Sequence, residues 1–295
     1  MNAYYKDYSD FLAEHFDCKV QKISINTGCL CPNRDGTIGT GGCIYCNNTA
    51  FTPGYAAPQL SVSEQIGKGV MFFGKKYPEM RYLAYFQSYT ATHTGAEKFL
   101  SDVREASEQP GIVGIVIGTR PDCMPDSLLC ELVEINRRLP VIVEFGAETS
   151  HNATLQAINR CHTWEQVVDA VTRTTRVGIP VGLHFILGLP GETEQMMLET
   201  IDAVNALPVS TIKFHQLQII QGTTLARMHA DTPITTFGVD EYIALCVKII
   251  HRLRRDIAID RFTSQAPPGL LIAPRWELKN YQFTHKLLAA LKNNP

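Results

Sequence analysis

The feature that most limits the possible folds of this 295-residue chain is an alternation of short apolar runs with longer segments of helical pattern. Six apolar, β-branched runs are continuous rather than alternating, as in strands covered on both faces. They span residues 22–26, 82–87, 111–118, 141–146, 181–187 and 211–217. Helical patterns separate them at 61–77, 96–107, 125–138, 163–177 and 193–206, and Ser61-Val-Ser-Glu64 suits a helix cap. Strands joined by helices form right-handed crossovers, so the order predicts a parallel sheet.

This periodicity leaves two α/β architectures open. Consecutive strand–helix units suit a partial (β/α)6 TIM-like barrel, and a doubly wound open sheet has the same pattern. We expect the barrel over residues 21–235, preceded by an N-terminal helical segment (1–20) and followed by a C-terminal helical extension packed on it (236–295). In either architecture ligands bind at the carboxyl ends of the strands.

Composition favours an ordinary globular protein, because 45% of the residues are hydrophobic and 19% are charged. The N-terminal residues lack a basic stretch followed by an apolar one, so secretion is not expected. The most apolar segments, such as 112–117 and 180–190, are too short to cross a bilayer. The sequence therefore predicts a cytoplasmic protein with no membrane partner.

Charge is unevenly distributed along the chain. From His251 onward eight Lys and Arg residues stand against three Asp and Glu, whereas the whole chain has a formal charge of −2. The basic end suits contact with a polyanion such as RNA, and it equally suits a solvated helical tail.

Nine cysteines are many for a chain expected in a reducing compartment, and an odd number also argues against complete disulfide pairing. Four of them fall within eighteen residues: Cys29, Cys31, Cys43 and Cys46. The scattered ones are interpreted as small buried hydrophobic residues: Cys18, Cys123, Cys130, Cys161 and Cys246.

The clustered cysteines admit several metal or redox sites. Cys43 and Cys46 form a C-x-x-C pair, and Cys31 precedes it across a glycine-rich linker whose backbone N–H groups can point at a cluster. A 4Fe–4S cluster held by three thiolates would leave one iron open. A structural zinc site would need a fourth ligand, which Cys29 could supply. A thioredoxin-like C-x-x-C would leave Cys31 unexplained.

The motifs Cys31-Pro-Asn-Arg-Asp-Gly-Thr37 and Gly41-Gly-Cys-Ile-Tyr-Cys46 resemble those of a bacterial radical S-adenosylmethionine (SAM) subfamily. The resemblance implies a 4Fe–4S cluster on Cys31, Cys43 and Cys46, with Tyr45 near the adenine of SAM. The eleven residues between the first two cysteines depart from the C-x-x-x-C-x-x-C spacing that is commonest in the superfamily.

Five later segments are similar, in the same order, to the radical SAM domain of the Elongator catalytic subunit, and more weakly to oxygen-independent coproporphyrinogen dehydrogenases: 117–122, 143–149, 155–162, 182–192 and 212–223. The resemblance implies reductive cleavage of SAM to a 5′-deoxyadenosyl radical, with electrons from an external donor of the flavodoxin or ferredoxin type. The first family suggests an RNA or tRNA substrate, and the second a small, tetrapyrrole-like one.

The same resemblance assigns SAM contacts to residues at strand ends. Gln87 and Ser88 stand where relatives have a Gly-rich motif, and Gly118 stands where relatives often have a glutamate for the ribose hydroxyls. Arg120 or Asp122 would then replace that glutamate. The remaining assigned contacts are Glu148, Arg160 and His184, with Arg160 suited to the SAM carboxylate.

Two further regions are expected near a substrate. His215 and Gln216 end the sixth strand, and the irregular stretch 264–275 is expected to cover the barrel mouth. Two other protein classes remain as alternatives, a zinc-stabilised nucleic-acid-binding protein and an iron–sulfur electron-transfer protein. Both would use Cys29 as a fourth ligand.

Overall fold

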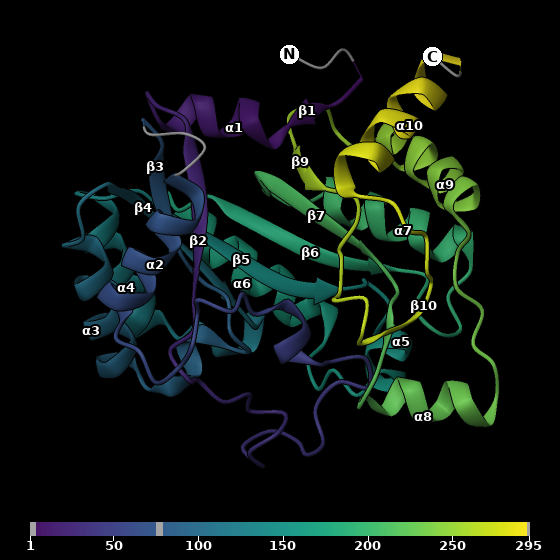
Figure 1. Ribbon diagram of the computed structural model, residues 1–295, viewed down its shortest axis with the longest axis horizontal. Helices are drawn as coiled ribbons and strands as arrows, with labels where there is room; N and C mark the ends of the chain where they lie inside the picture. Colours follow the sequence, from purple (N-terminus) through teal and green to yellow (C-terminus); the bar gives the residue numbers. More distant parts are fainter. Residues whose placement is uncertain (1–3, 75–78, 294–295) are drawn as a thin grey trace.

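The computed structural model describes residues 4–74 and 79–293, and an eight-stranded sheet with parallel neighbours runs through its centre (Figure 1). In spatial order the strands are β1 (Lys6–Asp7), β9 (Ala258–Arg261), β7 (Thr211–Gln216), β6 (Val181–Leu187), β5 (Val141–Glu148), β4 (Ile112–Thr119), β3 (Arg81–Phe86) and β2 (Val20–Ile25). The six predicted strands correspond to β2–β7, in the predicted chain order.

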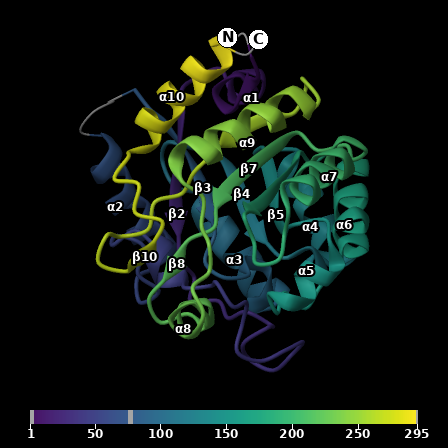
Figure 2. The ribbon, with the colours of Figure 1, turned by 90° about the vertical axis from the view of Figure 1, so that its right-hand side faces the viewer.

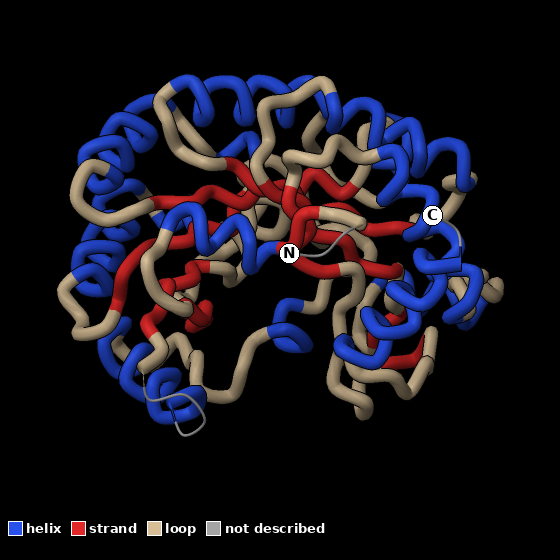
Figure 3. The backbone as a smooth tube through the Cα atoms, turned by 90° about the horizontal axis from the view of Figure 1, so that it is seen from above, coloured by secondary structure: helices blue, strands red, loops and turns tan. Residues whose placement is uncertain are grey.

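The helices lie on the outside of this curled sheet and form an arc around the strands (Figure 3). They are α1 (Tyr8–His15), α2 (Val62–Gly74), α3 (Ala96–Ser107), α4 (Asp126–Asn136), α5 (Asn152–Ala157), α6 (Trp164–Arg176), α7 (Glu194–Asn205), α8 (Thr224–Asp231), α9 (Val239–Arg252) and α10 (Asn280–Asn293). The predicted partial barrel with a helical C-terminal part is confirmed. Residues 75–77 of the helix predicted at 61–77 lie outside the described residues.

Local signals account for where several helices begin. Ser61 Oγ accepts a hydrogen bond from the Glu64 backbone at 3.1 Å, and Glu64 Oε2 accepts one from the Ser61 backbone at 2.8 Å. This reciprocal pair satisfies two N–H groups at the start of α2, as the sequence predicted. Thr163 and Gln166 form the same capping box at the start of α6.

The two faces of the sheet differ in chemistry because side chains alternate along each strand. Phenylalanines at most 1% exposed lie in the core between sheet and helices: Phe86, Phe145, Phe185 and Phe214. Phe86 packs edge-on against Phe99 of α3 with ring centroids 5.6 Å apart. The neighbouring positions carry Tyr85, Glu144, His184 and Lys213, which contact one another on the inner face. The inner face is therefore polar, and the outer face is the apolar core.

Four short strands and the C-terminal helices complete the fold. Strand β9 adds to the sheet beside β7, β1 pairs with β9, and β8 (Ile219–Ile220) pairs antiparallel with β10 (Leu271–Ala273). Helix α9 packs against α7 and α10. Single-turn 3₁₀ helices follow β2, β3 and β4: Asn48–Phe51, Ala91–Thr94 and Pro121–Cys123. Among the described residues no helix is long and apolar enough to cross a membrane.

Candidate functional site

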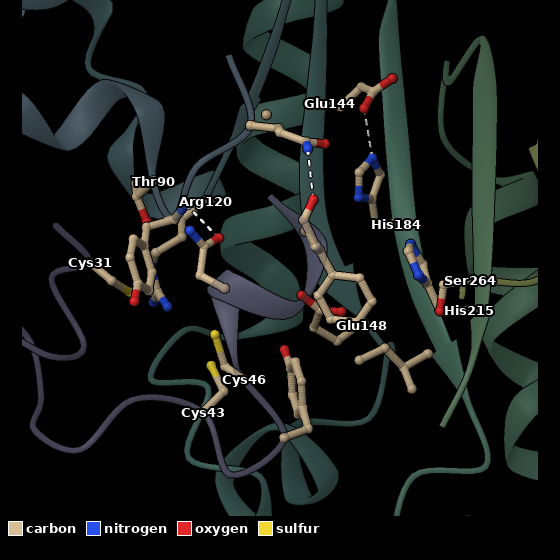
Figure 4. Close-up of a pocket in the computed structure, with 18 of the residues that line it drawn as sticks. Cys31, Cys43, Cys46, Thr90, Arg120, Glu144, Glu148, His184, His215 and Ser264 are labelled. Carbon is tan, nitrogen blue, oxygen red and sulfur yellow. Dashed lines mark hydrogen bonds and ion pairs between the residues drawn. The ribbon is translucent and has the colours of Figure 1, made fainter. Parts of the chain in front are cut away.

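A cavity of about 250 Å³ lies at the carboxyl ends of the parallel strands, on the polar inner face of the sheet. Strands β3 to β7 and β9 each contribute to its wall, and three cysteines line the opposite side (Figure 4). Of the predicted site residues, those on the wall are Cys31, Cys43, Tyr45, Cys46, Gln87, Arg120, Glu148, Arg160 and His184. Ser88 and Asp122 lie outside the lining, Ser88 being only 3% exposed.

The cysteine loop lies between β2 and α2 and reaches the same end of the molecule as α8 (Figures 1 and 2). A turn with a 3.1 Å hydrogen bond from the Cys46 N–H to the Cys43 carbonyl places both thiols on one side of the loop. Gly42 has φ of 76°, and a Cβ there would lie 2.6 Å from Arg34 Nε, so a side chain at this position would be strained. The loop is tied to the rest of the fold through Ile44, whose N–H bonds the Ile158 carbonyl at 3.1 Å.

Polar N–H groups contact the Cys43 sulfur and the loop backbone. Asn33 Nδ2 donates to Cys43 Sγ at 3.7 Å, and Arg160 Nη1 donates to the same sulfur at 3.6 Å. Arg34 Nη2 donates to the Cys46 carbonyl at 2.9 Å. Burial and then the neighbouring Cys43 raise the pKa of Cys46 to about 11, although the Arg34 guanidinium opposes the shift, so this thiol is protonated at neutral pH. A metal centre would have to ionise the Cys46 thiol, and two N–H donors already lie against the Cys43 sulfur.

Cys29 lies outside the cavity lining that contains the other three thiols. Its sulfur lies 2.7 Å from Thr27 Oγ1 and 3.8 Å from the Ala91 carbonyl oxygen, and burial raises its pKa. Within the described ranges, no group of three or more His, Cys, Asp or Glu side chains is arranged to hold a single metal ion. The engagement of Cys29 elsewhere counts against its being a fourth zinc ligand, whereas Cys31, Cys43 and Cys46 in one cavity lining fit a cluster held by three thiolates.

The other cysteines differ from the sequence-based expectation. Cys246 is buried, as predicted, but Cys18, Cys130 and Cys161 are exposed, so their interpretation as buried hydrophobic residues is wrong. Cys161 Sγ lies 3.2 Å from Asn33 Oδ1, because α5 brings the chain back to the cysteine loop.

Arg160 and Glu148 form a buried ion pair at the end of β5, with Arg160 Nη2 3.2 Å from Glu148 Oε1 and 2.7 Å from the Gly146 carbonyl. Glu148 has φ of 68°, a conformation that is strained for a residue with a side chain, and a bulge in β5 precedes it. Burial raises the pKa of Glu148. Arg160 Nε is buried and has no hydrogen-bond partner in the described part of the chain, so its donor capacity is not satisfied.

Arg120 and Asp122 pair with each other rather than standing free for a ribose. Arg120 Nε and Nη2 donate to the two oxygens of Asp122 at 2.9 and 2.8 Å, and Nη1 donates to the Arg160 carbonyl at 2.9 Å. Arg120 is 1% exposed. The Arg120 guanidinium, fixed by Asp122, thus holds the backbone of Arg160 in place.

Glu144, in the middle of β5, is the centre of a charged network that the sequence analysis did not single out. Its carboxylate accepts from Lys22 (2.6 Å), Lys213 (2.8 Å), Tyr85 (2.7 Å) and His184 (2.8 Å). Burial alone would raise the pKa of Glu144, but the two ammonium groups and His184 hold it well below its usual range. A charged residue inside each apolar run of β2, β5 and β7 was the signal for this network.

His184 is neutral in this network. Burial and Lys213 lower its pKa to about 4. Since the ionised Glu144 can only accept, His184 Nε2 carries the proton and Nδ1 is left as an acceptor. The predicted inward contact of His184 is thus to Glu144, at the wall of the cavity.

The far side of the cavity is formed by β7, β9 and the segment after β9. Arg261 Nη2 lies 3.2 Å from His215 Nε2. Ser264 is tied to Gln216 and Gln218 by hydrogen bonds of 2.9 to 3.3 Å. The stretch 264–275, expected over the barrel mouth, begins at this wall and lines a second cavity of about 340 Å³ next to the first. Arg261 was missed because a four-residue strand carries little periodic signal.

Two family models match the chain. The model described as "Radical SAM superfamily" matches residues 27–204, and the "Radical_SAM C-terminal domain" matches residues 209–293. The chain is 34% identical to YtqA of Bacillus subtilis over 96% of this chain and 88% of that protein. It is also 34% identical to YhcC of Escherichia coli (strain K12) over 90% of this chain and 85% of that protein.

A solved structure shares the fold. Elp3 of the archaeon Methanocaldococcus infernus, with an N-terminal deletion, superposes with a TM-score of 0.72 at 14% sequence identity, covering 94% of this chain and 63% of that one. At this low sequence identity, the similarity establishes a shared fold and nothing about activity.

Proposed function

The chain belongs to the radical SAM superfamily, and on that premise we propose that it binds one 4Fe–4S cluster through Cys31, Cys43 and Cys46 and cleaves SAM reductively. Superfamily membership implies SAM and an iron–sulfur cluster. When bound, the reduced cluster supplies the electron that converts SAM to methionine and a 5′-deoxyadenosyl radical. The observation that carries the proposal is that these three thiols line one wall of the cavity while Cys29 is engaged elsewhere.

The residues beside the cysteines support a site for the methionine end of SAM. Arg160 is held by Glu148 and by the Arg120–Asp122 fork, so its guanidinium is fixed before a ligand arrives. Its guanidinium on the cavity wall suits the SAM carboxylate. Glu148, buried beside the loop, suits the SAM amino group.

Other wall residues fit the remainder of SAM. Tyr45 precedes Cys46 and lines the cavity, where its ring can pack on the adenine. Gln87 lies at the end of β3, which passes so close to Gly118 that a Cβ there would lie 3.3 Å from the Phe86 carbonyl oxygen and 3.4 Å from Gln87 Cα. Ser88 and Asp122, outside the lining, would act only through neighbouring residues.

The substrate remains a prediction. An RNA substrate was suggested by the basic C-terminal part, yet Arg252 is paired with Asp202 and Arg254 with Asp256 in the structure. An external electron donor of the flavodoxin or ferredoxin type also remains a prediction. Adding tRNA, or a tetrapyrrole, to the reconstituted enzyme and measuring the rate of SAM cleavage would rank the two substrate classes.

The test of the proposed function is anaerobic reconstitution with iron and sulfide, followed by incubation with SAM and dithionite and quantification of 5′-deoxyadenosine. The wild type and Cys29→Ala should form the product, and Cys31→Ala should not. A wild type that binds zinc stoichiometrically, or that holds a reducible cluster and forms no 5′-deoxyadenosine, would refute the proposal.

A further inference from the structure

Arg261 is a cation without a counterion at the cavity wall opposite the cysteines. Figure 4 shows His184, His215 and Ser264 on that side, across the pocket from Cys31, Cys43 and Cys46. Arg261 belongs to the same lining. Throughout residues 4–74 and 79–293 no ion pair within 4.0 Å reaches Arg261, and its buried Nε has no hydrogen-bond partner.

The carboxylates nearest in the network are already engaged. Glu144 pairs with Lys22 and Lys213, at 2.6 and 2.8 Å, and Asp260 pairs with the same two lysines at 2.8 and 3.5 Å. Three cationic side chains therefore face two carboxylates on the inner face of β2, β5, β7 and β9. One positive charge is left, and it belongs to the cation that has no acidic partner, Arg261.

The imidazoles beside Arg261 do not add or remove charge. His215 Nε2 must accept the hydrogen bond from Arg261, because a guanidinium has donors only. Burial and Arg261 hold the pKa of His215 well below its usual range, so the ring is neutral and its proton is on Nδ1. The His215 and His184 rings lie 5.9 Å apart. The wall thus offers the Arg261 guanidinium, which lacks an acidic partner, and His215 Nδ1–H as donors.

From this arrangement we infer that Arg261, with His215, binds an oxyanion of the substrate, a carboxylate or a phosphate, at the end of the cavity opposite the three thiols. A guanidinium is the side chain best shaped for such a group, and a buried N–H without a partner carries a desolvation cost that a ligand oxygen removes. The assignment rests on the proposed function, since the oxyanion is that of the molecule on which the radical acts. Bound there, the substrate would lie in the same cavity as SAM.

The test uses cluster-free protein and titrates inorganic phosphate and, separately, malonate by isothermal titration calorimetry at low ionic strength. The wild type should bind at least one probe, and the tighter one identifies the phosphate or carboxylate class. Arg261→Gln should weaken binding about tenfold or more, the loss expected for one charge-assisted hydrogen bond. Arg261→Lys should retain part of the affinity, because the charge remains.

Two arginines serve as controls. Arg176→Gln changes an exposed guanidinium on the outer helix α6 and should bind the probes as the wild type does. Arg160→Gln tests whether the probes bind beside Cys43 instead. A wild type that binds neither probe, or a loss of binding in Arg160→Gln with none in Arg261→Gln, would overturn the inference.

A third measurement needs no variant. With imidazole nitrogens labelled, probe binding to the wild type should shift the His215 resonances and leave those of the exposed His251 unchanged. Unchanged His215 resonances at saturating probe would also overturn the inference. None of these readouts depends on SAM cleavage, so a failure of the proposed function and a failure of the oxyanion site are told apart.

Discussion

Arg160 Nη1 donates a hydrogen bond of 3.6 Å to the sulfur of Cys43, which joins the cysteine loop to the end of the central strand β5. The same guanidinium is paired with Glu148 and supported by the Arg120 fork through the Arg160 carbonyl. The site that would hold the cluster is therefore continuous with the site proposed for SAM, and a substitution in one should alter binding at the other.

Arg160→Gln should weaken SAM binding to the reduced cluster about tenfold or more, because a charge-assisted hydrogen bond is worth about 1.5–3 kcal/mol. The measurement is a SAM titration followed by the electron paramagnetic resonance (EPR) spectrum of the cluster. The double variant Arg160→Gln/Glu148→Gln avoids leaving an unpaired buried carboxylate and should show the same loss. An unchanged SAM affinity in both would remove Arg160 from the proposed site.

Gly146→Ala should disturb the same site without changing any charge. A Cβ at this position would lie 2.6 Å from Arg160 Nη2 and 2.9 Å from Glu148 Oε1, so the ion pair must shift. We expect lower SAM affinity with the cluster still bound, measured by iron content and by the SAM titration. Gly67→Ala is the matched control: it lies in α2 with no atom within 4 Å of the added Cβ and should stabilise the protein by about 0.5–1 kcal/mol. Equal SAM affinity in the two variants would contradict the geometry.

Glu144→Gln should lower the free energy of unfolding by about 3–5 kcal/mol near neutral pH, because Lys22 and Lys213 each lose one carboxylate partner in the interior. The pKa of Glu144 is lowered in the fold from its ordinary 4.5, so its contribution is present above that pH and is lost as the pH falls through the folded pKa. The difference between wild type and variant should therefore shrink in acid. Urea unfolding at several pH values measures this difference, with the exposed Glu134→Gln as control. A difference in unfolding free energy that grows as the pH falls would contradict the lowered pKa of Glu144.

His162 should make the protein less stable as the pH falls below neutral. Burial, with Arg160 and Arg120, lowers its pKa from 6.5 to about 3, so between these values the unfolded chain takes up a proton that the fold excludes. The wild type should lose roughly 1.4 kcal/mol per pH unit in that window from this residue. His162→Gln, which keeps a side-chain donor for the Gly146 carbonyl, should show a correspondingly smaller slope. Parallel curves for the two proteins would mean that His162 is not held neutral.

The strands and helices of the barrel could be predicted because each is encoded locally. The Val181–Leu187 strand and the Ala96–Ser107 helix have the predicted bounds, since a continuous apolar run and an amphipathic period bounded by glycine identify them. Strands β1 and β9 could not be predicted. They have two and four residues, and their pairing depends on where the rest of the chain places them.

For the site, the three cysteines and Arg160 were found through motifs, whereas the groups that surround them were not. Asn33, which donates to Cys43 and to the Asn159 carbonyl, lies inside the quoted motif, yet nothing in the linear sequence says that α5 returns to the loop. Lys22 and Glu144 are 122 positions apart, and only the parallel register brings them together. The role of Arg261 could not be predicted, because it depends on strand β9, which the sequence did not reveal, and on the contact of Arg261 with His215.

The most direct test of the account is the Mössbauer spectrum of wild-type enzyme reconstituted with ⁵⁷Fe, recorded with and without SAM. Three thiolate ligands on one cluster predict one iron whose isomer shift and quadrupole splitting change when SAM binds, while the other three keep theirs. The same change should occur in Cys29→Ala. A spectrum that SAM leaves unaltered, together with loss of the cluster in Cys29→Ala, would show that all four irons have protein ligands and would contradict the account.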